Sequence, residues 1–202
     1  MSAPAVDIAV VDYRAGNLTS VVKALTHLDA TLEVTSEPDV VYRAAKVVLP
    51  GVGHFAATQF LQERGLTDAI RSRVAQGVPF LGICVGLQWL FEGSTEAPDV
   101  PGAGFLKGCC ERFVTSEKIP HVGWNSLSVH PGSRLMAGVA EGSYVYYTHS
   151  YRASPQNDTV AVTEYGGPFS AAVESKNIMG VQFHPEKSGT VGLTIVKNFI
   201  EL

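Results

Sequence analysis

The sequence predicts an α/β fold with a mostly parallel central sheet flanked by helices, and an additional region of antiparallel strands in its second half. In the first half, short and nearly continuous apolar segments alternate with amphipathic ones, which is typical of buried parallel strands joined by helices. The second half is instead rich in Gly, Tyr, Val and Ser, with turn signals between its apolar stretches. The length of 202 residues suits one core, so we expect residues 1–202 to form a single domain.

Apolar spacing in the first half predicts an ordered succession of elements. A β-branched apolar run predicts the first strand, and apolar residues at helical spacing predict the helix that follows it. A proline opens the next expected helix, where its missing N–H does no harm. We expect strands at 6–11, 31–35, 46–49 and 79–83, and helices at 17–28, 38–45 and, as one or two helices, within 55–76.

Turn signals dominate the region from Phe105 to Phe183, where we expect antiparallel strands. They include the pairs Pro131-Gly132, Asn157-Asp158 and Gly166-Gly167. A closing helix at about 189–199 is expected to return the chain to the core. Internal repeats and low-complexity tracts are absent from the sequence, so a separate module joined by a linker is not indicated.

Composition and charge exclude several classes of function. The formal net charge is −4, and the 15 Lys and Arg residues form no basic run, so we expect no nucleic-acid partner. Neither a secretion signal nor an apolar run long enough to span a bilayer is present, so we expect a cytoplasmic protein without a membrane partner. The three cysteines, Cys84, Cys109 and Cys110, suit neither a disulfide framework nor a zinc site, and we expect no cofactor or metal.

Cys84 lies where a buried strand runs straight into a helix, with Gly82 and Gly86 two residues to either side. Such a strand-to-helix turn is typical of a nucleophile elbow, because its tight geometry leaves no room for larger side chains. A helix N-terminus also favours a thiolate. The alternative is an inert core cysteine, which is common in apolar segments.

A thiol nucleophile needs a base, and His184 and Glu186 are the candidates. His184 ends an alternating apolar segment, and Glu186 follows two residues later, so strand periodicity predicts both on one side. The imidazole would take the proton of Cys84 while the carboxylate fixes its tautomer. The alternative is a surface His and Glu at the end of a strand.

The third candidate segment is Gly51-Val52-Gly53, at the carboxyl end of a predicted strand, where α/β sheets place ligands. Its exposed backbone N–H groups suit the oxyanion of a tetrahedral intermediate, and the amide of Val85 would be the second donor. An ordinary strand-to-helix turn is the alternative for this segment taken alone.

With these three blocks in place, the chain resembles the class I (triad) glutamine amidotransferases, whose flavodoxin-like α/β fold carries a Gly-x-Cys-x-Gly elbow and a late His-Pro-Glu. The resemblance covers nearly the whole chain. Four further blocks resemble the glutaminase subunits that serve imidazole glycerol phosphate synthase, namely 12–17, 120–125, 148–151 and 184–188. In that branch the partner is a (β/α)₈ barrel cyclase, which forms a heterodimer with the glutaminase and uses its ammonia in histidine biosynthesis.

The resemblance implies a role for each matching position. Cys84 would attack the side-chain amide of L-glutamine, His184 would move protons, Glu186 would orient His184, and the oxyanion would face Val52 and Val85. Positions implied to bind the substrate are Gly51, Gly53, Gln88, Glu96, Ser150 and Tyr151. A carboxylate such as Glu96 suits an α-amino group, and Gln88 follows Cys84 by about one helical turn.

The resemblance also implies a face toward the cyclase, formed by Asn17, Trp124, Asn125, Tyr146 and Lys187. A tryptophan in such a strand region is equally expected in the core, so this role of Trp124 rests on the resemblance alone. In the family, glutaminase activity is weak until the cyclase binds its own ligand. A turn of the Val52 N–H toward the oxyanion is the switch that we expect.

Some positions depart from the family pattern, chiefly Arg14, where a Gly is usual, and Val85 and Leu87 within the elbow block. The two apolar changes conserve volume and are expected to be mild. Arg14 either alters affinity for the partner or pairs with an acidic residue there. Three other functions stay open at this point: a glutaminase subunit of another synthase, a catalytically idle interaction subunit, and a stand-alone cysteine hydrolase.

Overall fold

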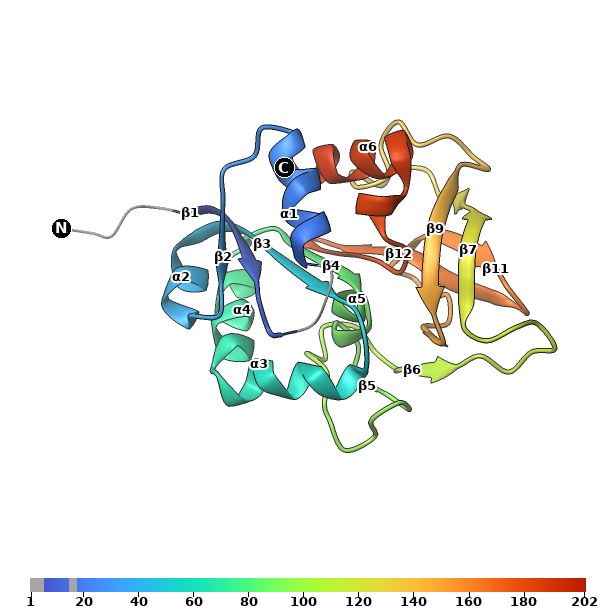
Figure 1. Cartoon of the computed structure of the whole chain (residues 1–202), viewed down its shortest axis with the longest axis horizontal. Coiled ribbons are helices and arrows are strands. Elements are labelled where there is room, and N and C mark those ends of the chain that lie inside the picture. Colours follow the sequence, from blue (N-terminus) through green and yellow to red (C-terminus); the bar gives the residue numbers. More distant parts are fainter. Residues whose placement is uncertain (1–5, 15–17) are drawn as a thin grey trace.

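The computed structural model describes residues 6–14 and 18–202. Within these residues, one large sheet crosses the molecule (Figure 1). Its strands lie in the order β2 (Leu32–Thr35), β1 (Val6–Val11), β3 (Ala44–Gly51), β4 (Phe80–Cys84), β13 (Ile178–Val181), β12 (Pro168–Ser175), β11 (Thr159–Glu164) and β8 (Ser128–Val129). The five strands from β2 to β13 are parallel, and β12, β11 and β8 continue the sheet antiparallel.

The parallel strands are buried because helices cover both faces of the sheet. All five residues of β4 are buried, as are five of the six in β1. Figure 1 shows α1 (Leu18–His27) and α6 (Gly189–Ile200) on one face of the sheet. The other face carries α2 (Pro38–Arg43), the 3₁₀ helix η1 (Phe55–Thr58), α3 (Gln59–Glu63), α4 (Leu66–Ala75) and α5 (Val85–Trp89). The predicted α/β class is therefore confirmed.

The second half adds smaller sheets beside the large one. β7 (His121–Ser126) pairs antiparallel with β9 (Tyr144–His149), and these strands lie together at one end of the molecule in Figure 1. A further small sheet contains β5 (Gly93–Ser94), β6 (Cys109–Arg112) and β10 (Tyr151–Arg152). The prediction that strands between Phe105 and Phe183 are antiparallel is wrong for two pairs, because β13 joins β4 in parallel and β6 joins β5 in parallel.

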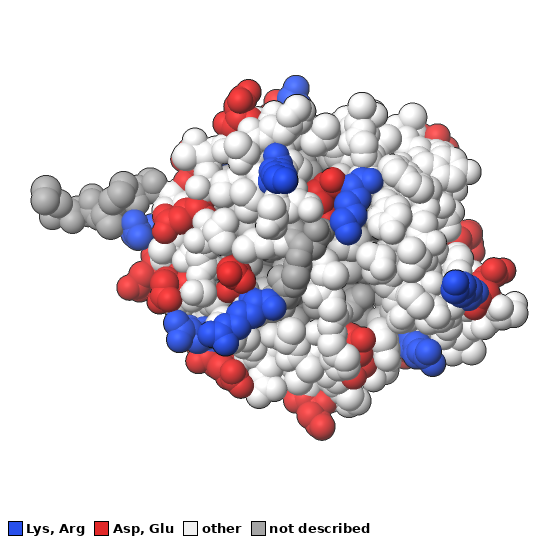
Figure 2. All heavy atoms as spheres, in the orientation of Figure 1, with Lys and Arg blue, Asp and Glu red and all other residues white. Residues whose placement is uncertain are grey.

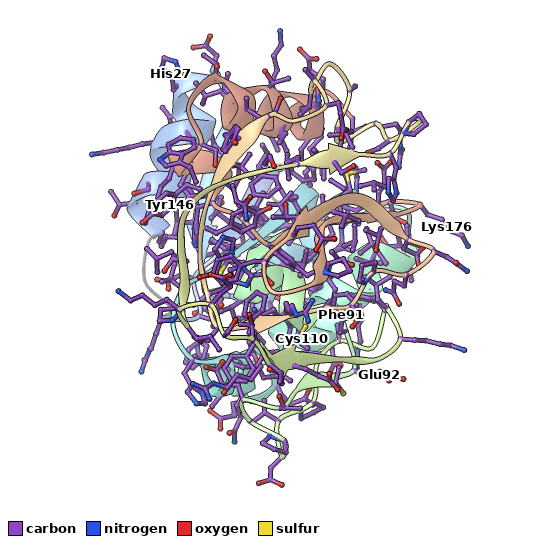
Figure 3. All side chains as sticks on the ribbon, turned by 90° about the vertical axis from the view of Figure 1, so that its right-hand side faces the viewer. His27, Phe91, Glu92, Cys110, Tyr146 and Lys176 are labelled. Atoms are coloured by element: carbon purple, nitrogen blue, oxygen red, sulfur yellow. The ribbon has the colours of Figure 1, made fainter. Side chains whose placement is uncertain are left out.

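Cys109 and Cys110 point to opposite sides of β6, as strand alternation predicts. Cys109 is exposed and Cys110 is buried, and both are free thiols. Figure 3 shows Cys110 and Phe91 in the interior and Tyr146 at the edge of the molecule.

Arg14 adopts a left-handed backbone conformation with φ 66°. Glycine enters this region without steric cost, which explains why the family's Gly is usual at this position. The Arg14 guanidinium lies 5.0 Å from the centre of the Phe60 ring. The structure therefore gives Arg14 a contact with α3 that the sequence did not suggest.

Acidic and basic side chains are interspersed on the face in Figure 2, without a large area of one sign. None of the described helices is long and apolar enough to cross a membrane. Within residues 6–14 and 18–202, no group of three or more His, Cys, Asp or Glu side chains is placed to hold a metal ion.

Candidate active site

A cleft of about 270 Å³ opens at the carboxyl ends of β3 and β4. It brings together most of the predicted site, although those residues come from distant parts of the chain. Its lining is Val52, Gly53, Cys84, Val85, Gln88, Glu96, Pro120, Thr148, His149, Ser150 and Tyr151. Pro120, Thr148 and His149 were not assigned to the site from the sequence, although all three fall within the quoted blocks 120–125 and 148–151.

Cys84 stands at the turn between β4 and α5 with φ 54° and ψ −107°. This conformation is rare for a residue with a side chain and is typical of a nucleophile elbow. A Cβ on Gly82 would collide with the backbone of Gly86, and a Cβ on Gly86 would collide with the carbonyl of Leu49. The flanking glycines are therefore required by packing, as predicted.

His184 and Glu186 form a buried pair, with His184 Nδ1 2.8 Å from Glu186 Oε1 and each side chain 1% exposed. Strand periodicity is the wrong reason for this pairing, because β13 ends at Val181 and residues Pro185–Lys187 form the 3₁₀ helix η2. The tight turn folds Glu186 back onto the ring. Since a carboxylate only accepts, Nδ1 carries the proton and Nε2 is left for Cys84.

The surroundings of His184 favour its charged form. Burial on its own lowers the pKa of His184, but the Cys84 thiol and the Glu186 carboxylate outweigh it and raise that pKa to about 10. An imidazole with this preference is a strong acceptor for the thiol proton. The arrangement of Cys84, His184 and Glu186 is that of a nucleophile, its base and the group that orients the base.

The loop after β3 lies beside the nucleophile, since Gly51 is the register partner of Cys84. Gly51 itself is buried behind the cleft, and a Cβ there would meet the Tyr13 hydroxyl. Only the next two residues, Val52 and Gly53, reach the lining, and Gly53 has φ 112°. Gly51, which was predicted to bind the substrate, therefore supports the loop from behind, where there is no room for a side chain.

Two predicted substrate positions also hold parts of the cleft together. Glu96 accepts a hydrogen bond from the Phe55 N–H at 2.8 Å, which fixes the start of η1 beside the loop. Gln88 donates through Nε2 to the Tyr151 carbonyl at 3.0 Å and to Gln182 Oε1 at 3.2 Å. Gln182 is fully buried and was not singled out from the sequence.

His149 and His121 form a second buried imidazole pair beside the cleft, with 3.0 Å between His149 Nε2 and His121 Nδ1. Burial lowers the pKa of His149 to about 3 and that of His121 to about 4, so both rings are neutral near pH 7. The Tyr151 carbonyl can only accept, so His149 Nδ1 donates to it at 2.9 Å and His149 Nε2 accepts from His121. This pair fixes the backbone carbonyl that in turn holds Gln88.

The family model for glutamine amidotransferase class-I matches residues 9–202 of this chain. The chain belongs to the class-I glutamine amidotransferases. The resemblance drawn from the sequence is thereby confirmed.

Two relatives narrow the similarity within the class-I glutamine amidotransferases. Imidazole glycerol phosphate synthase subunit HisH 1 of Methanococcus maripaludis is 44% identical, over 96% of this chain and 99% of that protein. The subunit HisH of Moorella thermoacetica is 46% identical, over 96% of this chain and 94% of that protein. A crystal structure of a glutamine amidotransferase shares the fold with a TM-score of 0.76 at 19% identity, covering 96% of this chain and 97% of that one.

Of the positions expected to face a partner in this class-I glutamine amidotransferase, Trp124, Asn125 and Tyr146 lie on the ribbon formed by β7 and β9, and Lys187 lies on η2. Trp124 is 55% exposed and packs edge-on against Tyr146 at 6.1 Å, and the Lys187 ammonium lies over the Tyr146 ring. The alternative, a tryptophan buried in the core, is therefore excluded. Asn125 points inward instead, since its Nδ2 donates to the Glu164 carbonyl at 3.0 Å. Asn17 lies outside the described residues.

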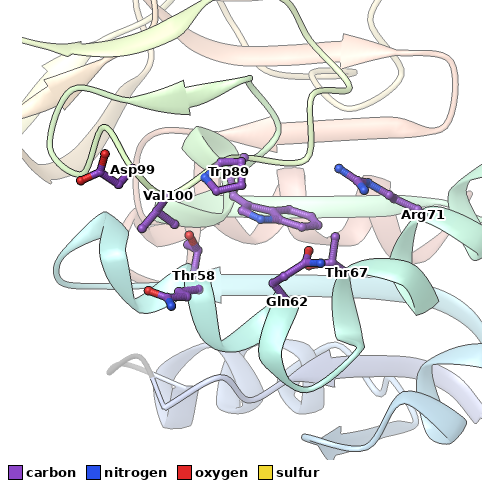
Figure 4. A pocket seen from close by; sticks show the side chains of 10 residues that line it. Thr58, Gln62, Thr67, Arg71, Trp89, Asp99 and Val100 are labelled. Carbon is purple, nitrogen blue, oxygen red and sulfur yellow. The ribbon is translucent and has the colours of Figure 1, made fainter.

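A second cavity, of about 350 Å³, is larger than the cleft and is lined by residues of α3, α4 and the end of α5. Figure 4 shows Trp89 at its centre, with Gln62 and Thr67 on one side and Asp99 and Arg71 at its two ends. Neither Cys84 nor His184 lines it. Of these two cavities, the smaller cleft is therefore the one lined by Cys84.

Proposed function

We propose that this chain hydrolyses L-glutamine to glutamate and ammonia as the glutaminase subunit of an imidazole glycerol phosphate synthase, in histidine biosynthesis. The observation that carries the proposal is the triad: Cys84 at a strained elbow, and the buried His184 and Glu186 pair with Nδ1 and Oε1 2.8 Å apart. Identities of 44% and 46% to HisH subunits, over nearly the full chain, support the choice of synthase.

The reaction begins when His184 Nε2 takes the proton of Cys84, and the thiolate attacks the carboxamide carbon of glutamine. The oxyanion of the tetrahedral intermediate is stabilised by the backbone N–H groups of Val85 and, once its loop turns, Val52. His184 then protonates the leaving nitrogen, so ammonia departs and a glutamyl thioester remains on Cys84. Water, deprotonated by His184, hydrolyses the thioester to glutamate and restores the thiol.

The cleft offers complementary groups for the substrate. Gln88 Nε2 already donates two hydrogen bonds within the protein, so its Oε1 is the atom left to accept from glutamine. The Glu96 carboxylate lines the same cleft and suits the α-ammonium group. Backbone groups of Gly53, Ser150 and Tyr151 complete the site. We also place the reaction in the cytoplasm, because all three cysteines, each within the described part of the chain, are free.

The partner in this proposal is a cyclase subunit with a (β/α)₈ barrel, which forms a heterodimer with this chain and receives the ammonia. The supporting surface is the outer side of the β7 and β9 ribbon, where Val122, Trp124 and Tyr144 are 56%, 55% and 59% exposed. Large apolar and aromatic side chains that are exposed together are typical of a protein interface. Lys187 and Tyr146 extend this surface toward the triad.

The test is glutamate release from glutamine, measured with and without a cyclase partner and the ligand of that partner. We expect release only in the complete mixture, and Cys84→Ala is expected to abolish it, because Cys84 is the thiol that lines the cleft and neither Cys109 nor Cys110 does. Ammonia added to the Cys84→Ala complex is expected to support full cyclase turnover.

Each alternative function predicts a different result in the same assay. Release by the chain alone indicates a stand-alone hydrolase, and release with a different synthase partner indicates another branch. No release in any mixture with Cys84 intact indicates an idle interaction subunit. Loss of the ammonia-dependent reaction in Cys84→Ala would assign Cys84 a structural role.

A further inference from the structure

Gln182 is buried in the centre of the site, between the end of β13 and His184, and its side chain is 0% exposed. Its Nε2 lies 3.7 Å from Cys84 Sγ, within hydrogen-bonding distance for sulfur. Its Oε1 accepts from Gln88 Nε2 at 3.2 Å. One amide group thus contacts both the nucleophile and a residue of the substrate cleft.

The direction of this hydrogen-bond chain is fixed by a backbone carbonyl. The Tyr151 carbonyl can only accept, so Gln88 must present its NH₂ group there, at 3.0 Å. The same nitrogen is a donor toward Gln182, so the oxygen of Gln182 faces Gln88. The NH₂ group of Gln182 therefore faces the sulfur. The opposite orientation would place the NH₂ groups of Gln182 and Gln88 against each other and Oε1 of Gln182 against the thiolate.

We propose that Gln182 stabilises the thiolate of Cys84 by donating an N–H to its sulfur. When the proton moves from Cys84 Sγ to His184 Nε2, the electron pair stays on sulfur, and the hydrogen bond from the neutral amide becomes a charge-assisted one. Burial makes this contribution larger than it would be in water. The proposal rests on the nucleophilic role of Cys84 in the proposed function and deepens it.

The titratable groups that face Cys84 come from several elements. His184 and, behind it, Glu186 lie on the turn after β13, Tyr13 follows β1, and Glu96 lies across the cleft. Gln182 itself does not titrate. Replacing it by an apolar side chain leaves all four groups in place, so a change in the pH dependence of Cys84 reactivity reports the loss of the amide.

The experiment measures carbamidomethylation of Cys84 by iodoacetamide against pH in the full chain, with each modified peptide quantified by mass spectrometry. The exposed thiol of Cys109 serves as an internal reference in the same molecule. Gln182→Met keeps the length of the side chain and removes its donor. We expect Cys84 to react about tenfold more slowly near neutral pH, with its half-maximal rate shifted by about one pH unit to the alkaline side and an unchanged plateau.

Gln156→Met is the matched control, since Gln156 is a half-buried glutamine that does not line the cleft. We expect Gln156→Met to leave the pH dependence of Cys84 alkylation the same as in the chain without a substitution. Gln182→Leu is a second variant without a donor and is expected to give the same shift, which guards against a defect specific to methionine. Urea unfolding of each variant identifies any that fails to fold.

If the pH of half-maximal Cys84 alkylation is unchanged in a folded Gln182 variant, the proposal is overturned. This holds even if the alkylation rate falls by the same factor at every pH. Such a result would leave the amide a packing role only. Because alkylation needs neither glutamine nor a partner, this outcome is distinguishable from failure of the proposed glutaminase activity, which is measured by glutamate release.

Discussion

Cys84 occupies a backbone conformation, φ 54° and ψ −107°, that costs a non-glycine residue about 1–3 kcal/mol. The surrounding packing holds it there, because β4 and α5 meet at this residue and are both buried. Gly82 leaves space for the backbone of Gly86, and Gly86 leaves space for the Leu49 carbonyl. The position of the thiol is therefore set by two residues that have no side chain.

Gly86→Ala tests this steric requirement. Its Cβ would collide with the Leu49 carbonyl, so β3 and α5 must separate, and overpacking of this kind costs about 1–3 kcal/mol. We expect a lower urea midpoint and a loss of glutamate release in the complete complex. Gly93→Ala is the control, since the nearest atom to its Cβ is at an ordinary 3.6 Å. Equal midpoints for the two variants would contradict the steric account.

At the scale of elements, the sequence predicts the parallel strands and most helices because their patterns are local. The His184 and Glu186 pair is also predicted, although through strand alternation, whereas a 3₁₀ turn produces it. A His-Pro-Glu sequence favours such a turn once the strand has ended, since Pro presets the first helical residue. The pattern shows which residues meet, and the backbone between them decides how.

Other parts of the site could not be predicted because they depend on long-range contacts. Gln182 meets Gln88 across 94 positions of sequence, and Glu96 meets the Phe55 N–H across 41. No local pattern reports such a contact. The parallel pairing of β13 with β4 is of the same kind, since strand spacing gives no neighbour across 98 residues. Only the resemblance to a family supplied Gln88 and Glu96.

The turn that carries His184 is fastened to β9 through Ser188. The Ser188 hydroxyl donates to the His184 carbonyl at 2.6 Å and accepts from the Tyr146 N–H at 3.0 Å. The His184 N–H in turn donates to the Tyr146 carbonyl at 2.9 Å. The backbone of a strand whose outward side chains face the proposed partner therefore positions His184, the proposed base.

Ser188→Ala leaves the Tyr146 N–H and the His184 carbonyl without this buried hydroxyl. We expect the free energy of unfolding to fall by about 1–3 kcal/mol, because buried polar groups lose their hydrogen bonds. Glutamate release in the complete complex should fall as well, since His184 loses its anchor. Ser128→Ala on β8 is the control, because Ser128 is exposed. A Ser188→Ala protein with unchanged stability and activity would show that β9 does not position the turn.

At the scale of the whole molecule, the β7 and β9 ribbon has two different faces. Val122, Trp124 and Tyr144 point outward, whereas His121, Tyr147 and His149 point into the core. On the inward face, His149 donates to the Tyr151 carbonyl, and the same carbonyl accepts a hydrogen bond from Gln88. A partner bound to the outward face would act on a ribbon that contacts the cleft through His149 and the triad through Tyr146.

The buried imidazoles of that inward face make the stability of the molecule sensitive to acid. Burial holds the pKa of His149 near 3 and that of His121 near 4, whereas an unfolded histidine titrates near pH 6.5. Below pH 6.5 the unfolded chain therefore binds protons that the folded chain does not. The stabilisation is fully present above that pH and is lost as the pH falls toward the folded pKa values. His149 alone is expected to cost about 1.4 kcal/mol per pH unit in this window.

Urea unfolding at pH 7, 6 and 5 measures this slope, and His149→Gln isolates the contribution of one ring. Glutamine can still donate to the Tyr151 carbonyl but does not titrate. The free energy of unfolding of the variant should therefore fall less steeply as the pH is lowered, and the difference in slope should correspond to about one proton. Other acid-sensitive groups remain in both proteins, and Glu174 is one of them. Burial on its own would raise the pKa of Glu174, but hydrogen bonds from Ser133 and Arg134 outweigh burial and lower that pKa. Identical slopes for the two proteins would show that His149 is already protonated in the folded state near neutral pH, and that its hydrogen bonds follow a different pattern.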